Sequence, residues 1–423
     1  MDRFVIRGGK PLSGKVEISG AKNASLALMP ATILASGHYV LSNTPLLRDI
    51  TTMSRLLETM GLKIAHANHT MTVDSSTISH YEAPYEHVKK MRASIYVLGP
   101  LLGRYGQAKV SMPGGCAWGP RPVNLHLEGM KKLGAEINLE GGYIVARAKR
   151  LRGAQILFDV SSVGATGNVL MAAVLARGIT TIHNAAIEPE ITSLAEFLVS
   201  MGAKIQGVGT STLEIEGVDE MRPKDVVTIP DRIEAGTFLI AGVIAGRKGE
   251  KIRLDHCNPQ HLGEVIAMLE NAGVNMVCGS DFIEIQAPGE IRAVNVSTAI
   301  YPGFPTDMQA QWIALMTLAK GTSVVMDTVY HDRFMHVPEL NRLGADITVK
   351  DNMATVVGGR KLTGAKVMST DLRASASLIL AGLAAEGTTE VLRVYHLDRG
   401  YESIEKKLQT LGADIERARG EEF

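Results

Sequence analysis

The sequence of 423 residues lacks the features that mark secreted, membrane and nucleic-acid-binding proteins. Its three cysteines, Cys116, Cys257 and Cys278, share no CxxC spacing, which argues against a disulfide framework and favours a reducing compartment. Acidic and basic residues number 44 each, and this zero net charge argues against nucleic acid or an anionic membrane as an obligate partner. No apolar run approaches the roughly eighteen residues of a membrane span. The start, MDRFVIRGGK, has no apolar core of a signal peptide. We therefore expect a soluble cytoplasmic protein.

The fingerprints of several enzyme classes are also missing. There is no GxxxxGK[ST], no GxGxxG that opens a helix after a strand, and no GxSxG. His66 and His69 fall in an expected polar turn, and His331 and His336 have no partner ligands at metal spacing. We expect neither a metal nor another cofactor.

The most informative feature that is present is an internal repeat. Six amphipathic helices are each expected to end at a glycine corner and run into a strand, and six apolar helices end at a second set of glycines. The first set is Gly61, Gly134, Gly202, Gly273, Gly344 and Gly412, and the second is Gly37, Gly106, Gly178, Gly249, Gly321 and Gly387. Both sets recur at intervals of roughly seventy residues, which indicates one supersecondary unit copied six times.

Each repeat reads approximately as βαβαββ. In the last copy, from Asp371 to Phe423, ASASLILAGLAAEG is apolar all round, as in a buried helix, and YESIEKKLQTLGA has one apolar face. A repeat this small cannot bury both of its faces alone, so the copies are expected to pack against one another. An open solenoid is disfavoured because its end repeats should look atypical, and these do not. Six copies divide into two domains of three, with the polar stretch from Glu216 to Asp231 as the expected linker.

The six expected buried helices begin with polar first turns, and four of these turns carry Lys or Arg. The turns contain Lys22 and Asn23, Arg92 and Ser94, Thr166 and Asn168, Arg232 and Glu234, Thr306 and Asp307, and Asp371 and Arg373. A helix N-terminus presents unpaired N–H groups and favours anions, whereas a cation there weakens the helix slightly. The pattern favours convergent binding of phosphate and carboxylate groups. The alternative is ordinary N-capping with incidental surface cations.

A second unusual segment is MPGGCAWGPRP, from Met112 to Pro122, which is rich in glycine and proline and reads as an exposed, mobile loop. Cys116 lies in this loop near Arg121, which makes it a candidate reactive acid or nucleophile. An exposed cysteine without a role is the alternative. Cys257 and Cys278 fall beside or within strand-like stretches, and we expect them to be inert core residues.

Eight segments together resemble one family. They are ISGAKNA, MRASI, PGGCAWGPRP, SVGATGN, FPTDMQAQ, RFMHVPEL, DLRASASL and HLDRGYE, and they resemble the UDP-N-acetylglucosamine 1-carboxyvinyltransferase family of enolpyruvyl transferases. The resemblance implies an α/β (α+β) fold of two domains, each with three βαβαββ units around a pseudo-threefold axis, as an inverse α/β barrel with an active-site cleft between the domains. It implies an N-terminal domain of residues 22–229 that carries the Cys116 loop. Residues 1–21 together with 230–423 would form the C-terminal domain.

The resemblance also implies the substrates, phosphoenolpyruvate and UDP-N-acetylglucosamine, and the residues that bind them. Lys22, Arg121 and Arg399 match positions that hold the phosphate of phosphoenolpyruvate, and Arg333 and Arg373 match positions near its carboxylate. The remaining implied substrate-binding residues are Asn23, Arg92, Pro122, Val123, Asn124, Leu125, Ser161, Ser162, Val163, Asp307, Val329 and Asp371. No oligomeric state is predicted.

The implied reaction is an addition followed by an elimination, in the first committed step of peptidoglycan precursor synthesis. Cys116 matches the family's general acid, which can also add covalently to the substrate, and Asp307 matches the residue at the sugar hydroxyl, the natural general base. Lys22 and Arg399 would stabilise the departing phosphate. Inactivation by the epoxide fosfomycin at Cys116 is a further implication.

Two departures from the family pattern concern the nucleotide. Asn124 stands where many relatives have Asp, and Val160-Ser161 stands where some have Lys-Val. Two other functions compete with the first. One is the sister transferase that acts on shikimate 3-phosphate, and the other is a catalytically silent nucleotide-sugar-binding protein. Lys22, Cys116, Asp307 and Arg399 together disfavour the silent protein, because a binding module needs no acid–base pair.

Overall fold

The structure, a computed structural model, describes residues 2–89, 91–112, 123–246 and 249–419. Contacts divide the chain into two compact units. Unit 1 consists of Met1–Ser19 and Pro230–Phe423, and unit 2 consists of Gly20–Ile229. Each unit has its own hydrophobic core.

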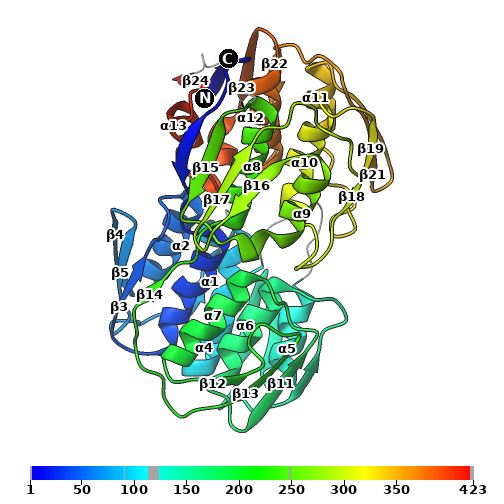
Figure 1. Ribbon diagram of the computed structural model, residues 1–423. Coiled ribbons are helices and arrows are strands. Elements are labelled where there is room, and N and C mark those ends of the chain that lie inside the picture. The colour runs from blue at the N-terminus through cyan, green and yellow to red at the C-terminus, as the bar shows by residue number, and fades with distance from the viewer. Residues whose placement is uncertain (1, 90, 113–122, 247–248, 420–423) are drawn as a thin grey trace. The chain divides into compact units, whose positions relative to one another are not determined.

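Among the described residues, each unit contains three four-stranded sheets of one topology (Figure 1). The first two strands of every sheet are parallel, and the third and fourth add as antiparallel neighbours. The sheets of unit 2 are β14 (Val226–Val227), β3 (His38–Ser42), β5 (Thr70–Asp74), β4 (Lys63–Ala67); β6 (Glu82–Ala83), β7 (Gln107–Ser111), β9 (Tyr143–Arg147), β8 (Glu136–Glu140); and β10 (Gln155–Leu157), β11 (Ile179–His183), β13 (Thr212–Glu216), β12 (Lys204–Gln206). The sheets of unit 1 are β2 (Gly14–Glu17), β15 (Lys251–Asp255), β17 (Phe282–Gln286), β16 (Asn275–Cys278); β18 (Val296–Ser297), β19 (Thr322–Met326), β21 (Met353–Val357), β20 (Asp346–Lys350); and β22 (Lys366–Met368), β23 (Thr388–Leu392), β1 (Asp2–Arg7), β24 (Asp414–Arg419).

The helices fall into a buried set and an outer set, as the repeat predicted. The buried set comprises α1 (Lys22–Ala31) with the 3₁₀ helix η1 (Thr32–Leu34), η2 (Arg92–Val97) with α4 (Leu98–Tyr105), and α6 (Val163–Ala173) in unit 2, and α8 (Arg232–Ala245), η4 (Thr306–Met308) with α10 (Gln309–Met316), and α12 (Leu372–Ala384) in unit 1. The outer set comprises α2 (Arg48–Thr59), α5 (Asn124–Lys132), α7 (Pro189–Ser200), α9 (Gly263–Asn271), α11 (Val337–Arg342) and α13 (Ile404–Thr410), with the short segments α3 (Tyr85–Val88), η3 (Pro259–Leu262) and η5 (Val394–Arg399) between elements.

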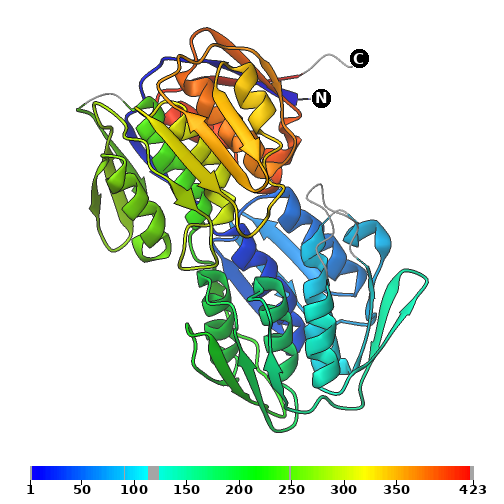
Figure 2. The ribbon, with the colours of Figure 1, turned by 90° about the vertical axis from the view of Figure 1, so that its right-hand side faces the viewer.

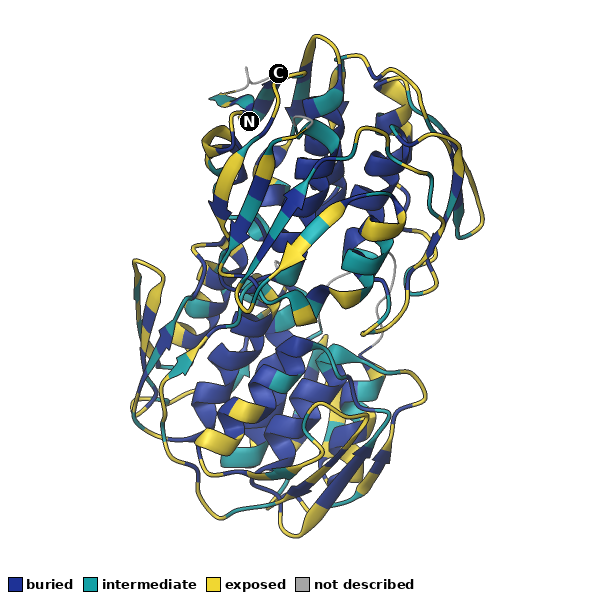
Figure 3. Ribbon diagram, viewed as in Figure 1, coloured by how far each residue is buried: buried dark blue, intermediate teal, exposed yellow. Residues whose placement is uncertain are grey.

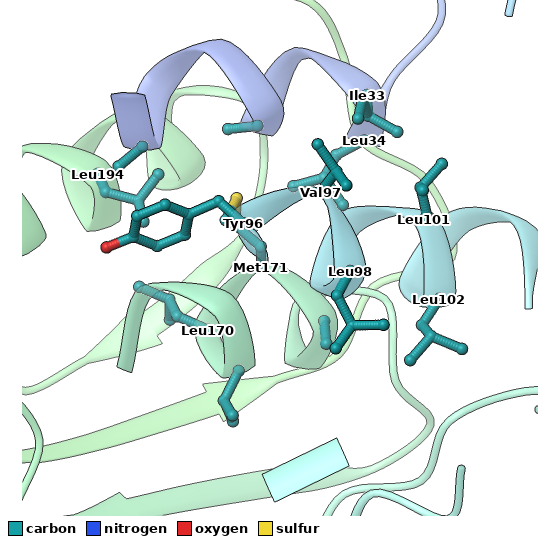
Figure 4. Packing of buried hydrophobic residues seen from close by; sticks show 14 of the residues in the cluster. Ile33, Leu34, Tyr96, Val97, Leu98, Leu101, Leu102, Leu170, Met171 and Leu194 are labelled. Atoms are coloured by element: carbon teal, nitrogen blue, oxygen red, sulfur yellow. The ribbon is translucent and has the colours of Figure 1, made fainter. Parts of the chain in front are cut away.

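The central helices are held by apolar burial on all sides. In unit 1, α8, α10 and α12 pack against one another, and every residue of α10 is buried. In unit 2, residues of η1, η2, α4 and α6 gather in one apolar cluster (Figure 4). Helices α4 and α6 approach so closely that a Cβ at Gly99 would lie 2.1 Å from the carbonyl oxygen of Asn168. Strands of the outer hairpins alternate between buried and exposed residues, so each sheet covers the central helices with one face (Figure 3).

The glycine corners of the repeat have a common backbone cause. All six glycines of the first set have positive φ, and each directly follows the C-cap residue of an outer helix, which is the C′ position. The second set differs from the prediction in detail. Gly106 caps α4 with a left-handed conformation, but α12 is capped by Ala385, and Gly387 instead turns the chain into β23.

Three strands belong to sheets that are otherwise formed by distant parts of the sequence. In unit 1, the N-terminal strands β1 and β2 complete two sheets that are otherwise formed by residues beyond 250, and β1 lies between β23 and β24 (Figure 2). In unit 2, β14 pairs with β3 and completes the first sheet. The stretch from Glu216 to Asp231, expected as a linker, therefore contains a strand of unit 2 and ends at Asp231, the N-cap of α8.

Two local expectations were wrong. Cys278 is exposed, because it ends the edge strand β16 at the tip of a hairpin, whereas Cys257 is buried as predicted. His66 lies within β4 rather than in a turn, and its Nε2 is 3.1 Å from the carbonyl oxygen of Thr44. No helix in the described parts of the chain has the length and apolar character needed to cross a membrane.

Candidate active site

A carboxylate held between two mostly buried guanidinium groups forms a charged cluster in unit 1. Asp307 Oδ1 is 2.8 Å from Arg333 Nη1, and Asp307 Oδ2 is 2.9 Å from Arg373 Nη2. The Arg333 and Arg373 side chains are only 9% and 4% exposed, whereas that of Asp307 is 28% exposed. The carboxylate is thus the part of this cluster that faces solvent most.

Three different segments deliver these side chains. Asp307 lies in η4, at the start of a central helix, and Arg373 is the second residue of α12. Asp371 caps α12 by accepting hydrogen bonds from the backbone N–H groups of Arg373 and Ala374, which fixes the first turn that carries Arg373. Arg333 precedes α11, and its carbonyl oxygen accepts a hydrogen bond from Gln309 Nε2. Asp307, Arg333 and Arg373 are therefore brought together as a site.

The two arginines determine the protonation of Asp307. Burial alone would raise the pKa of this carboxyl, but Arg373 and then Arg333 reverse that effect, and the pKa lies well below its ordinary value. Asp307 is therefore ionised and a weak base while both arginines contact it.

Arg373 has unused hydrogen-bonding capacity. Its Nη1 is buried and has no hydrogen-bond partner among the described residues. The Arg373 guanidinium lies 5.4 Å from the centre of the Tyr401 ring, and Gln311 Nε2 donates to the hydroxyl oxygens of Tyr401 and Thr237. A buried cation with an unsatisfied N–H is suited to bind an additional anion.

A second carboxylate organises the loop that carries Val329. Asp327 is fully buried, and its Oδ1 accepts hydrogen bonds from Thr298 Oγ1 and from the backbone N–H groups of Val329 and Tyr330. Its Oδ2 accepts a hydrogen bond of 2.7 Å from Thr306 Oγ1. This loop therefore has a defined backbone next to the Asp307 cluster.

Arg399 is the last residue of η5 in unit 1 and is partly buried. Its neighbour Asp398 forms an ion pair of 2.5 Å with Arg417, which also lies 3.3 Å from Glu405. These contacts hold the end of η5 in place.

Unit 2 carries its own cationic helix start. Lys22 is the first residue of α1, and its Nζ is 3.5 Å from Asp49 Oδ2 in the first turn of α2. The two side chains are only 11% and 5% exposed, while Asn23 beside Lys22 is exposed. A mostly buried lysine at a helix start is suited to bind a phosphate.

Arg92 begins η2 near a buried histidine. His126 Nδ1 is 3.0 Å from Asn168 Nδ2, which also donates to the carbonyl oxygen of Ile95. Burial, aided by the Arg92 charge, lowers the pKa of His126 to about 3, so the ring is neutral. Because an amide N–H can only donate, Nδ1 accepts, and the ring proton is on Nε2.

Two further helix starts in unit 2 carry the remaining described residues of the predicted set. Val123 is the N-cap of α5, which begins at the exposed Asn124 and continues with the half-buried Leu125. Ser161, Ser162 and Val163 are all half-buried at the start of α6, where the Ser162 side chain accepts a hydrogen bond from the N–H of Ala165.

Three predicted site residues, Cys116, Arg121 and Pro122, lie outside the described residues. The roles assigned to them remain predictions, as does the convergence of the set in unit 1 with the set in unit 2. Within the described residues, no group of three or more His, Cys, Asp or Glu side chains could hold a metal ion.

Sequence reasoning missed Asp49, His126 and Asp327. Asp49 and Asp327 look like ordinary acidic residues at a helix start and a strand end, and no spacing marks them as buried partners of Lys22 or Thr306. His126 is a single histidine on the buried face of an amphipathic helix. A search for ionisable residues on the expected buried faces of amphipathic helices would have found His126.

A family model described as EPSP synthase (3-phosphoshikimate 1-carboxyvinyltransferase) matches residues 6–408. Curated relatives match the chain over nearly its whole length. The protein of Chloroherpeton thalassium named UDP-N-acetylglucosamine 1-carboxyvinyltransferase is 62% identical, with 100% of this chain and 99% of that protein covered. Proteins of the same name from Chlorobium chlorochromatii and Geotalea uraniireducens are 57% and 54% identical, with at least 99% of each chain covered.

Solved structures share the fold. The enolpyruvyl transferase NikO from Streptomyces tendae has a TM-score of 0.89 at 28% identity, with 98% of both chains covered. The EPSP synthase from Acinetobacter baumannii has a TM-score of 0.77 at 19% identity, with 99% of this chain and 100% of that chain covered. The predicted two-domain arrangement of βαβαββ repeats is thus confirmed as the fold class.

Proposed function

Since the chain belongs to the EPSP synthase (3-phosphoshikimate 1-carboxyvinyltransferase) family, we propose that it transfers the enolpyruvyl group of phosphoenolpyruvate to the 3′-hydroxyl of UDP-N-acetylglucosamine and releases phosphate. This would be the first committed step of peptidoglycan precursor synthesis. The name shared by full-length relatives at 54–62% identity supports this acceptor over shikimate 3-phosphate.

The structural observation that carries the proposal is the position of Asp307 between Arg333 and Arg373. The transfer needs cationic groups for an anionic donor and a carboxylate that can take a proton from a hydroxyl. The site in unit 1 contains both, and Arg373 Nη1, which has no hydrogen-bond partner among the described residues, would bind the donor's carboxylate. In unit 2, Lys22 is a mostly buried cation, and it would bind the phosphate.

The chemistry divides into two balanced steps. In the addition, C3 of phosphoenolpyruvate gains a proton and becomes a methyl group, while the sugar oxygen bonds to C2 and its proton passes to Asp307. In the elimination, C3 returns a proton to the Cys116 thiolate formed in the addition, the bond between C2 and the phosphate oxygen breaks, and inorganic phosphate leaves. Cys116 would supply the proton to C3, and Lys22, Arg121 and Arg399 would stabilise the charge of the leaving phosphate.

The donor's carboxylate would also activate the base. When it contacts Arg373 and Arg333, each guanidinium shares its charge with a second anion, and Asp307 loses part of the stabilisation that keeps its pKa low. Its pKa then rises toward the range in which it accepts a proton from the sugar hydroxyl. Donor binding would therefore prepare the base before the acceptor reacts.

We place the reaction in the cytoplasm, because both substrates are multiply charged and do not cross a bilayer unaided. The same assignment makes Cys116 the target of fosfomycin, whose epoxide a reactive thiolate would open.

One assay separates the proposal from its two competitors. Inorganic phosphate is measured with phosphoenolpyruvate and either UDP-N-acetylglucosamine or shikimate 3-phosphate as acceptor. We expect release only with the nucleotide sugar. Release only with shikimate 3-phosphate would establish the sister activity. Tight binding of the nucleotide sugar without release would establish the silent binding protein.

A further inference from the structure

We propose that Asp327 is a positioning residue that orients Arg333 through the hydroxyl of Thr306, and so sets both the donor site and the base strength of Asp307. This inference rests on the proposed function. Two successive hydrogen bonds connect the three residues, because Thr306 Oγ1 is 2.7 Å from Asp327 Oδ2 and 3.1 Å from Arg333 Nη1. The same Nη1 is 2.8 Å from Asp307 Oδ1.

The direction of these hydrogen bonds follows from the chemistry of the groups. A guanidinium can only donate, and an ionised carboxylate can only accept. The single hydroxyl proton of Thr306 therefore points to Asp327, which leaves its lone pairs for Arg333. Without the carboxylate, the hydroxyl could turn its proton toward Arg333, and the contact would become repulsive.

The Asp327 carboxylate is held firmly enough to orient Thr306. Its side chain is fully buried and accepts three further hydrogen bonds, from Thr298 Oγ1 and from the N–H groups of Val329 and Tyr330. Its backbone N–H donates to the carbonyl oxygen of Asn352, and Asn352 Nδ2 donates back to the Asp327 carbonyl oxygen. The carboxylate is thus fixed from both its side chain and its main chain.

A second route leads from Asp327 to the same guanidinium. Asp327 holds the backbone of Tyr330, and the Arg333 guanidinium lies 5.7 Å from the centre of the Tyr330 ring. Among its neighbours, Arg333 therefore contacts Thr306, Asp307 and Tyr330. Two of these three neighbours take their position from the Asp327 carboxylate.

The consequence for Asp307 follows from its charged surroundings. The groups that act on its carboxyl are Arg373 on α12 and Arg333 before α11, and Arg373 is in turn influenced by Tyr401 and Asp231. If Arg333 loses its orientation, Asp307 keeps one close cation instead of two. The donor carboxylate also loses one of its proposed partners.

The test compares Thr306→Val with Thr306→Ser, and uses Thr317→Val as a matched control. Thr317 is also buried and also donates its hydroxyl to a neighbour, the Ala314 carbonyl oxygen, but it has no contact with Arg333. For Thr306→Val we expect about a tenfold or larger rise in the KM for phosphoenolpyruvate. The acid limb of the kcat/KM profile should move up by about one pH unit. Thr306→Ser and Thr317→Val should remain near the wild type in both measurements.

A double-mutant cycle tests the role of Asp327 itself. Asp327→Asn should raise the KM for phosphoenolpyruvate in the wild-type background. It should raise this KM much less when Thr306→Val is already present, because the hydrogen bonds that connect Asp327 with Arg333 are then already lost. Fully additive effects would show that Asp327 acts by another route. Unchanged KM and unchanged acid limb in Thr306→Val would overturn the proposal.

A measurement without turnover keeps this inference separate from the proposed function. The carboxyl carbon of Asp307 can be followed by NMR during a pH titration of the ligand-free protein. Thr306→Val should raise the pKa of Asp307, and Thr317→Val should leave it unchanged. If the wild type releases no phosphate with either acceptor, the proposed function is wrong. The titration still decides whether Thr306 connects Asp327 with Arg333 and Asp307.

Discussion

Replacing Asp307 with Asn tests the charge cluster most sharply. The substitution keeps the size of the side chain and one oxygen acceptor but removes the charge that balances Arg333 and Arg373. Removing one partner of a buried ion pair costs about 3–5 kcal/mol, because the remaining charge stays buried. Asp307 is 28% exposed and its amide oxygen still accepts a hydrogen bond, so we expect a smaller loss of about 2 kcal/mol in the free energy of unfolding of unit 1.

At about 2–4 °C per kcal/mol for a domain of this size, the melting temperature of Asp307→Asn should fall by about 4–8 °C. Phosphoenolpyruvate should restore more stability to this variant than to the wild type, because its carboxylate supplies the missing counter-charge. Phosphate release should fall by about 10²–10⁴-fold, the usual contribution of a general base. The assays are thermal unfolding with and without the donor, and phosphate release with both substrates.

The pH dependence of the stability of Asp307→Asn is an independent test of the charge cluster. The pKa of Asp307 is lower in the folded protein than in the unfolded chain. Its contribution to stability is therefore fully present above about pH 4 and is lost as the pH falls through the folded pKa. Asp307→Asn should lack this component of acid unfolding. An equal or higher melting temperature in Asp307→Asn, without extra stabilisation by the donor, would refute the view that this carboxylate neutralises the two arginines.

Three further predictions concern unit 2 and the cysteines. Cys116→Ala should nearly abolish phosphate release at neutral pH and prevent covalent addition of fosfomycin, as mass spectrometry can show. Cys257→Ala should remain active, because burial raises the pKa of Cys257 to about 12. His126 has a folded pKa of about 3, so unit 2 should lose up to about 1.4 kcal/mol of stability per pH unit as the pH falls below about 6.5, and His126→Gln should flatten this slope in urea titrations at several pH values. Asn168→Leu should cost about 2–4 kcal/mol by the same titrations, because it leaves the Gly99 N–H and the Ile95 carbonyl group without their partner.

The sequence predicted the repeat and its buried helices because both have local causes. A glycine with positive φ after an outer helix is needed at each corner, and a helix that is apolar all round can only be central. The position of β1 has no local cause. It pairs with β24 some four hundred residues away, and only the family resemblance implied that the first residues belong with the second half of the chain.

For the site, the sequence identified cations at helix starts but not their partners. Arg373 and Asp307 were both predicted as site residues, yet nothing in their spacing indicated that they form an ion pair across 66 positions. Asp327 could not be distinguished from any acidic residue that follows a strand, because its importance arises from the burial of its carboxylate. The residues that touch a substrate leave a pattern in the sequence, whereas the residues that orient them depend on tertiary packing.

The most direct test of enolpyruvyl transfer is the structure of the product. After incubation with phosphoenolpyruvate, UDP-N-acetylglucosamine is isolated and examined by mass spectrometry and NMR. We predict a carboxyvinyl ether on the 3′-oxygen of the sugar, formed in equal amount to the released phosphate. An unmodified nucleotide sugar accompanied by free phosphate, or a substituent on any other oxygen, would contradict the account.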